Sequence, residues 1–322
     1  MKFRTGAMRA LCVGMLSALL VSCGGEELVP FSPARLIVFG DEASVIVAGA
    51  SPTDGRKYSV NYVDDTTGAV DCGRNPSWIQ VLANEYDINF PQCPLPTESF
   101  TVGQIRAIAG AQAGGASDID LTSQVSRQLA LSAADGGGIT ATDLVSVFIG
   151  VNDIVAAYER YRAGGSYDDA IAAVEAAGET LAEQINRIAE AGGKVIVSTV
   201  PDVGVTPYAV ALSAADAERL TFLTGRLNAR LLVTVNNDGR KIGLIELNPY
   251  LITVVANPLA YGYLDVWEAA CLPPDPLECT NKTLQADATS YNWLWASALQ
   301  MSPGGHAQLG SLAASRAKNQ PF

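Results

Sequence analysis

Short, continuously apolar runs alternate along the chain with longer segments in which apolar residues recur every three or four positions. Four apolar runs stand out, each followed by glycine, proline or a polar residue: 36–39, 143–149, 194–200 and 242–247. Runs of this kind are typical of strands buried on both faces of a parallel sheet. Helical spacing predicts the longest helices over 167–191 and 214–235. This order predicts an α/β fold, with a three-layer α/β/α arrangement around a central, mostly parallel sheet.

Weaker patterns predict the remaining elements. Apolar spacing indicates helices over 78–86 and 121–133, and a closing helix is expected over 306–317. A short strand over 105–109 is implied by the family resemblance described below. The segments 49–76 and 87–104 are rich in turn residues and are predicted as loops, with a short hairpin in the first. Because the chain shows no internal repeat, we expect one domain over 34–322.

The first residues have the pattern of a secretory signal. Three positive residues precede an apolar segment over 10–21, which is too short to cross a bilayer, and Leu-Val-Ser-Cys follows at 20–23. This tetrapeptide resembles the bacterial lipobox, which implies cleavage before Cys23 and lipidation of that residue. We therefore expect a signal peptide over 1–22 and a Gly/Glu/Pro tether over 23–33. An ordinary signal peptide with an incidental cysteine is the alternative.

Residue 24 is glycine, not the aspartate that would suggest retention in the inner membrane. By the same resemblance, this favours an outer-membrane lipoprotein of the bacterial envelope. The pattern leaves open whether the protein faces the periplasm or the cell surface.

The net charge of the chain argues against two classes of binding partner. The 322 residues carry a net charge of −12, and residues 1–22 hold three positive and no negative residues, so the mature chain is near −15 (−12 − 3). An acidic surface argues against nucleic acid as a partner and against electrostatic docking on anionic lipid. The glycine run around residues 110–115 lacks the spacing of a nucleotide-binding loop, so we expect no nucleotide cofactor.

Cysteine usage fits an oxidising compartment. Of six cysteines, Cys12 is removed with the signal and Cys23 is expected to carry lipid, which leaves four. Of three connectivities, the pairs Cys72–Cys93 and Cys271–Cys279 are the most economical. Metal binding competes with this interpretation, but the spacings differ from those of zinc sites and the single histidine is distant in sequence. We therefore expect no metal site.

Candidate chemistry follows the predicted strands. Gly40-Asp41-Glu42 ends the first, Gly110 follows the strand over 105–109, and Gly150-Val151-Asn152-Asp153 ends the run over 143–149. Because the carboxyl ends of parallel strands meet at one sheet edge, these residues should lie close together.

These stretches resemble three blocks of the SGNH/GDSL esterase–lipase family: Gly-Asp-Ser, a glycine after a short strand, and Gly-x-Asn-Asp. The tail of the strand over 194–200, Pro-Asp-x-Gly-x-Thr-Pro, resembles the lipase-like branch of that family. The resemblance implies the SGNH-hydrolase, flavodoxin-like fold and hydrolysis of carboxylic esters. It also implies that the backbone N–H of residue 42, Gly110 and Asn152 would stabilise the oxyanion.

The family's catalytic triad is nevertheless substituted. The last family block, Ala-Asp-x-x-His-Pro-(Ser/Thr)-Pro-x-Gly-His, aligns through Pro303 and His306. Glu42 then stands at the position of the serine nucleophile, Gln300 at that of the histidine base and Ser297 at that of the aspartate. Ester hydrolysis needs a hydroxyl nucleophile and an imidazole base. We therefore expect a degenerate binding or envelope protein, with an ester, acyl or glycan ligand as the candidate partner besides the membrane.

Two alternatives remain beside that interpretation. One is an active esterase or lipase with a rewired site built on Glu42 or His306, and the other is a structural envelope protein in which the old cleft has no role. We expect His306, Ser44 and Ser302 to be structural, in packing, capping or turns. A specific hypothesis concerns Glu42: its carboxylate folds into the oxyanion pocket and accepts hydrogen bonds from Gly110 N–H and Asn152.

Overall fold

A computed structural model describes residues 31–51, 53–94, 101–131, 137–273 and 275–322. The predicted signal peptide, the lipidation site at Cys23 and most of the predicted tether lie outside these residues. The description below concerns the unit Ser32–Phe322.

A five-stranded sheet forms the centre of this unit, and all of its pairings are parallel. Its strands are β1 (Arg35–Gly40), β6 (Gln104–Ile105), β7 (Asp143–Phe148), β8 (Lys194–Ser198) and β9 (Ile242–Ile245). The spatial order is β6-β1-β7-β8-β9, which is the 2-1-3-4-5 order of flavodoxin-like folds. The predicted fold class is confirmed. The chain order reverses at β1, so the expected ligand crevice lies at the carboxyl ends of β1 and β7.

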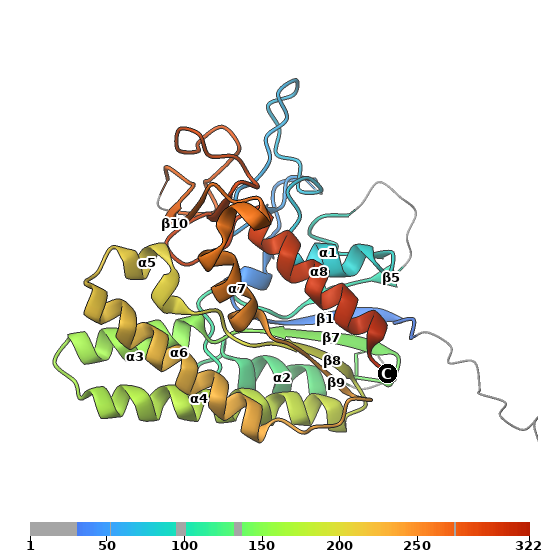
Figure 1. Ribbon diagram of the computed structural model, residues 1–322. Coiled ribbons are helices and arrows are strands. Elements are labelled where there is room, and N and C mark those ends of the chain that lie inside the picture. The colour runs from blue at the N-terminus through green and yellow to red at the C-terminus, as the bar shows by residue number, and fades with distance from the viewer. Residues whose placement is uncertain (1–30, 52, 95–100, 132–136, 274) are drawn as a thin grey trace, which may run out of the picture. The chain divides into compact units, whose positions relative to one another are not determined.

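Helices cover both faces of the sheet (Figure 1). On one side lie α2 (Leu121–Leu129), α3 (Val151–Arg162), α4 (Tyr167–Glu190) and α6 (Ala214–Thr234), and on the other α1 (Trp78–Asn84), α7 (Leu247–Ala256) and α8 (Pro303–Asn319). The continuous apolar pattern of β7 follows from this enclosure, because every one of its six residues is buried. The main core packs strand residues such as Val145 and Val197 against Leu121 of α2 and Ile185 of α4.

Shorter helices and strands lie in the segments that connect these elements. They are η1 (Glu42–Ser44), η3 (Val203–Val205), η4 (Pro258–Tyr261), α5 (Pro207–Val210) and three two-stranded pairs: β2 (Ile46–Val47) with β3 (Arg56–Lys57), β4 (Ile88–Asn89) with β5 (Thr101–Val102), and β10 (Asp265–Ala269) with β11 (Trp293–Trp295). Figure 1 shows β10 and its neighbouring loops above the sheet, on the side of α7 and α8. Both predicted disulfides are present, Cys72–Cys93 and Cys271–Cys279.

Several predicted boundaries were wrong. The strand predicted over 105–109 is the two-residue β6, because the chain leaves the sheet after Ile105. The second helix ends at Leu129, not at 133. The closing helix begins at Pro303, three residues earlier than predicted, because Ser302 caps it by accepting a hydrogen bond from Gly305 N–H. The helices α3 and α7 were not predicted.

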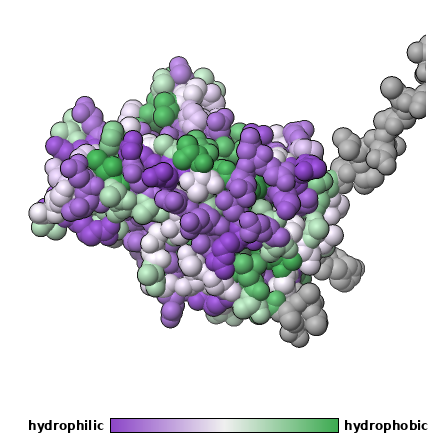
Figure 2. Space-filling view, turned by 90° about the horizontal axis from the view of Figure 1, so that it is seen from below, coloured by the Kyte–Doolittle hydropathy of each residue, from purple (hydrophilic) through white to green (hydrophobic). Residues whose placement is uncertain are grey.

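Figure 2 shows the molecule from below the view of Figure 1, and hydrophilic residues dominate this face. Hydrophobic side chains are interrupted by hydrophilic ones there, as on an ordinary solvated surface. In the part of the chain that the structure describes, no helix combines the length and the apolar character needed to span a bilayer.

Candidate active site

The candidate residues meet at the switch point of the sheet. Glu42 is the first residue of η1, two residues after β1, and Asn152 is the second residue of α3, just after β7. Gly110 lies in the loop that follows β6. These three strands are neighbours in the sheet, so the prediction that the residues gather at one edge is confirmed.

The end of β1 requires glycine and is held by a buried amide. Gly40 has φ +150°, and a Cβ at this position would lie 2.3 Å from the Phe148 carbonyl oxygen of β7. The side chain of Gln124, on α2, accepts a hydrogen bond from Gly40 N–H (3.1 Å) and donates one to Gly40 C=O (2.9 Å). Gln124 is buried, so this pair of bonds fixes the direction in which the chain leaves the strand.

Glu42 is the acceptor on which three donors converge. Its Oε2 accepts hydrogen bonds from Gly110 N–H (2.9 Å) and from Asn152 Nδ2 (3.0 Å). Its Oε1 accepts one from Gln300 Nε2 (3.0 Å). The hypothesis that the carboxylate folds toward Gly110 and Asn152 is confirmed by these contacts. The bond from Gln300 was not foreseen, although residues at the nucleophile and base positions of one site are expected to be neighbours.

Further contacts hold in place the two groups that donate to Glu42 Oε2, which are Asn152 Nδ2 and Gly110 N–H. Asn152 Nδ2 also donates to Ala111 C=O (3.0 Å), which ties α3 to the loop that carries Gly110. The Asp153 carboxylate accepts hydrogen bonds from Ala113 N–H and Gly114 N–H, both at 2.8 Å. Burial raises the pKa of Asp153 to about 6 despite these bonds. Gly110 has φ +80°, a conformation in which glycine is favoured.

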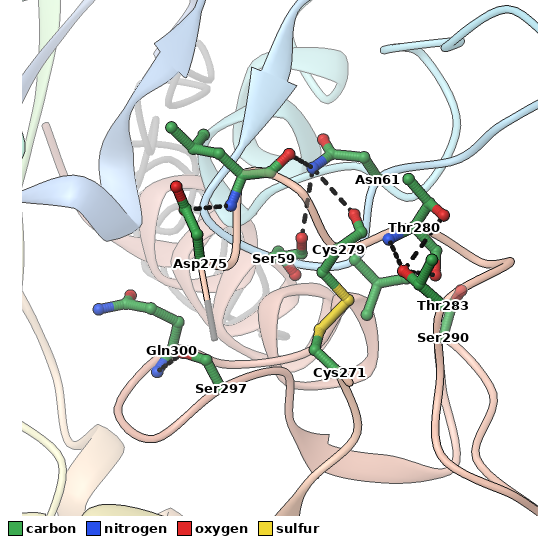
Figure 3. Close-up of a disulfide and its surroundings, with 12 residues drawn as sticks. Ser59, Asn61, Cys271, Asp275, Cys279, Thr280, Thr283, Ser290, Ser297 and Gln300 are labelled. Atoms are coloured by element: carbon green, nitrogen blue, oxygen red, sulfur yellow. Dashed lines mark hydrogen bonds between the residues drawn. A yellow bond between two sulfur atoms is a disulfide. The ribbon is translucent and has the colours of Figure 1, made fainter. Parts of the chain in front are cut away.

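Gln300 is presented by a tight turn. The backbone N–H groups of Ala296 and Ser297 both donate to Gln300 C=O (2.8 and 3.2 Å), and Gln300 N–H donates to Ser297 Oγ (3.3 Å). Ser297 therefore shapes the turn. Figure 3 shows Ser297 and Gln300 on one side of the Cys271–Cys279 disulfide and Asn61 on the other.

His306 lies apart from this cluster. It is buried in the first turn of α8, and its Nδ1 accepts a hydrogen bond from Trp78 N–H (3.3 Å) at the start of α1. Burial, and to a smaller extent the charge of Lys57, lowers the pKa of His306 to about 3. The expected packing role agrees with this environment, in which the chain's single imidazole is bonded to a helix start.

The serines weighed as alternatives are also engaged in structural contacts. Ser44 is buried and its Oγ accepts a hydrogen bond from Trp78 Nε1 (3.2 Å). Ser302 Oγ donates to Trp293 C=O (2.5 Å) and caps α8. Ser302 is therefore structural, as predicted, whereas the Ser44 side chain contacts Trp78 instead of capping a helix.

A small cavity adjoins the cluster at Gln300. A cavity of about 10 Å³ lies between Asp41, Phe148, Trp295 and Gln300, which is roughly the volume needed for one water molecule. A larger cavity of about 470 Å³ lies at the β2–β3 hairpin, beside Leu277 and Glu278, and its lining does not include Glu42, Asn152 or Gln300. Burial, and next the charge of Glu42, raises the pKa of Asp41 well above its usual range.

This geometry places hydrogen-bond donors around a carboxylate. Donors that converge on one point in a partly buried site can stabilise a developing oxyanion. Here they surround a carboxylate that belongs to the chain, and the side chains that make these contacts, Glu42, Asn152 and Gln300, include neither a hydroxyl nor an imidazole. In the described part of the chain, no group of three or more His, Cys, Asp or Glu residues could hold a metal ion.

Sequence reasoning missed two residues that position the site. Gln124 faces the core together with Leu121 and Val125, and a polar residue on the buried face of an amphipathic helix is a usable signal for such a role. Asp153 was quoted only as part of its block, and its bonds to two successive backbone N–H groups depend on a loop whose path the sequence does not reveal.

Comparison with known proteins supports a family assignment. The family model described as GDSL-like Lipase/Acylhydrolase matches residues 45–271. The match begins after Glu42 and ends before Ser297 and Gln300, so the triad correspondence of these three residues depends on the block alignment. No curated protein matches the chain.

Solved structures that are similar to the chain include the following three. Phospholipase A1 from Streptomyces albidoflavus is 16% identical over 88% of this chain and 98% of its own, with a TM-score of 0.43. A catalytic mutant of an acetylxylan esterase from Geobacillus stearothermophilus is 10% identical over 92% and 98%, with a TM-score of 0.46. The M. smegmatis aryl esterase is 14% identical over 89% and 99%, with a TM-score of 0.42.

Proposed function

Since the chain belongs to the GDSL-like lipase/acylhydrolase family, we propose that it is a member that no longer hydrolyses esters by the serine mechanism and acts as a binding or scaffolding protein of the cell envelope. The observation that carries this proposal is the carboxylate of Glu42, which occupies the place where three donors converge. The family's oxyanion-stabilising groups thus hold an internal anion instead of a substrate.

The chemistry of Glu42 supports this proposal. A carboxylate attacks an unactivated ester poorly, and attack would produce an anhydride instead of the usual acyl-serine. As a general base, Glu42 would have to accept a proton from water with oxygens that already accept three hydrogen bonds.

The place of the protein in the cell is part of the same proposal. The signal-like segment and Leu-Val-Ser-Cys at 20–23 support an outer-membrane lipoprotein anchored through Cys23. An ester, acyl or glycan compound is the candidate ligand class, since the family acts on acyl esters. Such a ligand would bind outside the occupied oxyanion position.

Hydrolysis of p-nitrophenyl acetate and p-nitrophenyl palmitate by the purified mature chain tests the loss of catalysis. The parent should show no rate above buffer, within an assay able to detect the roughly thousandfold acceleration that oxyanion donors alone can give. The triple variant Glu42→Ser, Ser297→Asp, Gln300→His should gain measurable turnover. Glu42→Ser alone, which restores the hydroxyl without a base, is the matched control and should stay near the parent. Parent activity that disappears in Glu42→Ala would instead support the rewired esterase.

Fractionation of cells that express the full chain tests the anchor. We expect the parent in the outer-membrane fraction and a Cys23→Ser variant in the soluble or uncleaved precursor fraction, because that variant lacks the acceptor thiol. A single acyl chain binds membranes only marginally, so retention should depend on complete lipid modification of Cys23. Equal membrane retention of both proteins would contradict lipidation at this residue.

A further inference from the structure

We infer that the Cys271–Cys279 disulfide is a positioning element for the occupied site, because it braces the turn that presents Gln300 to Glu42. This inference rests on the proposed function, in which the Glu42 carboxylate holds the oxyanion donors. It assigns to one of the two disulfides a local role beyond the stability of the fold.

The contact path from the disulfide to Glu42 is short. Cys271 and Cys279 form a buried cluster with Val60 and Ala296, and Leu284 packs against it. Cys271 N–H donates to Ala296 C=O (3.0 Å), and Ala296 N–H donates to Gln300 C=O (2.8 Å). Gln300 Nε2 then donates to Glu42 Oε1 (3.0 Å). Each link is a direct hydrogen bond or a packing contact, so a shift of Ala296 should be felt at Gln300.

The other side of the disulfide is fixed to the body of the domain. Asn61 is buried, and its backbone N–H donates to Cys279 C=O (2.9 Å) while its Nδ2 donates to Leu277 C=O (3.3 Å). Thr280 and Thr283 close the turn that follows, since Thr280 N–H donates to Thr283 Oγ1 (2.9 Å). Figure 3 shows this network and the Ser297–Gln300 turn on opposite sides of the bridge. The disulfide therefore connects this hydrogen-bonded network to the segment that packs against the Gln300 turn.

The second disulfide provides a matched comparison. Cys72–Cys93 has a sequence separation of 21 residues, against 8 for Cys271–Cys279. The longer loop should contribute more to global stability, because it restricts the unfolded chain more strongly. Gln80 of α1 donates a hydrogen bond to Cys93 Sγ (3.5 Å), so this bridge contacts α1. Loss of Cys72–Cys93 should thus lower global stability more, whereas loss of Cys271–Cys279 should disturb the position of Gln300 more.

The experiment compares the double variants Cys271→Ala/Cys279→Ala and Cys72→Ala/Cys93→Ala by NMR of the side-chain amide of Gln300. A Gln300→Ala variant of the full mature chain assigns the resonance. We expect loss of the Cys271–Cys279 bridge to move the Gln300 amide shift toward that of a free glutamine and to speed its solvent exchange at least tenfold. Loss of Cys72–Cys93 should lower the melting temperature more and leave this resonance in place.

A milder variant covers the case in which the first double variant does not fold. Leu284→Ala retains the disulfide and loosens its packing, so the same change in the Gln300 amide should appear at reduced size. An unchanged Gln300 resonance in the folded bridge variant, or in Leu284→Ala if only that variant folds, would overturn the inference. If the wild-type Gln300 amide already resembles a free side chain, the proposed occupation of the site fails instead, so the two failures are distinguishable.

Discussion

At the scale of single residues, the length of Glu42 accounts for the character of the site. Glutamate is long enough to bring its own oxygens to Gly110 N–H and Asn152 Nδ2, and Gln300 supplies a third N–H. The side chains at 42 and 300 are therefore complementary, because an amide donor faces a carboxylate acceptor. Under the proposed function, these two residues stand where the family has its nucleophile and its base.

His306 makes the stability of the domain sensitive to acid. Its pKa is about 3 in the fold, below its ordinary value of 6.5, so between these values the unfolded chain binds a proton that the folded chain does not. This group should thus lower the free energy of unfolding by roughly 1.4 kcal/mol for each pH unit below 6.5. We expect a His306→Asn variant, whose amide oxygen can still accept from Trp78 N–H, to show a shallower decline between pH 6 and pH 4.

Urea unfolding of both proteins across this range measures the difference. Ordinary carboxylates titrate in both proteins and cancel in the comparison. Lys57, which is buried near His306 and has a pKa lowered by burial to about 7, is also common to both. Parallel stability–pH curves would contradict the assigned environment of His306.

At the scale of elements, buried amides hold the ends of two strands. Gln124 of α2 pairs with both backbone groups of Gly40 after β1. Asn228 of α6 pairs in the same way with Val200 after β8, with both bonds at 2.8 Å. In each case a helix side chain bonds both the backbone N–H and the C=O of one residue at the end of a strand, and Gly40 C=O also accepts a bond from Ile108 N–H (3.1 Å). The strand-to-loop transitions that deliver site residues are thereby fixed from the helix layer.

A Gln124→Leu variant tests the first of these amide pairs. It leaves the N–H of Gly40 buried without its partner, at a cost of about 1–3 kcal/mol. It also removes the hydrogen bonds that Gln124 donates to Gly40 C=O and Ile119 C=O. We expect a loss of about 2–4 kcal/mol in the free energy of unfolding, measured by urea denaturation. Thr122→Leu, on the same helix but half-exposed, should change it by less than about 0.5 kcal/mol. Similar losses in the two variants would refute a specific role for Gln124.

Elements with strong local patterns could be predicted, and those with weak start signals could not. The strands β1, β7, β8 and β9 follow apolar runs, and α4 and α6 follow clear helical spacing. The helix α3 begins after Gly150, without a side-chain cap, and α7 begins after Glu246, also without one. The helix start signal depends on such caps, so its absence explains these omissions. The β10–β11 pair joins segments far apart in sequence, which local patterns do not report.

At the scale of the whole molecule, the parallel sheet explains why the site residues could be anticipated from sequence. Glu42, Gly110 and Asn152 follow three strands that are neighbours at the switch point, so topology alone brings them together. Gln300 comes from outside the sheet, and its placement depends on the loop network around the Cys271–Cys279 disulfide. The positions of such loops follow from tertiary contacts and not from periodicity, which is why the third bond to Glu42 was missed.

The central claim is that the converging donors form a carboxylate site filled by Glu42, and binding of acetate to a Glu42→Ala variant tests it most directly. Acetate has four heavy atoms, so its binding free energy is bounded at about −6 kcal/mol and the dissociation constant should lie in the millimolar to high micromolar range. A titration with ¹³C-labelled acetate, at ionic strength held constant with chloride, is suited to this range. We predict saturable one-to-one binding to Glu42→Ala, none to the wild type and none to Glu42→Ala/Asn152→Ala. Equal binding to the wild type and Glu42→Ala, or no binding to Glu42→Ala, would contradict the account.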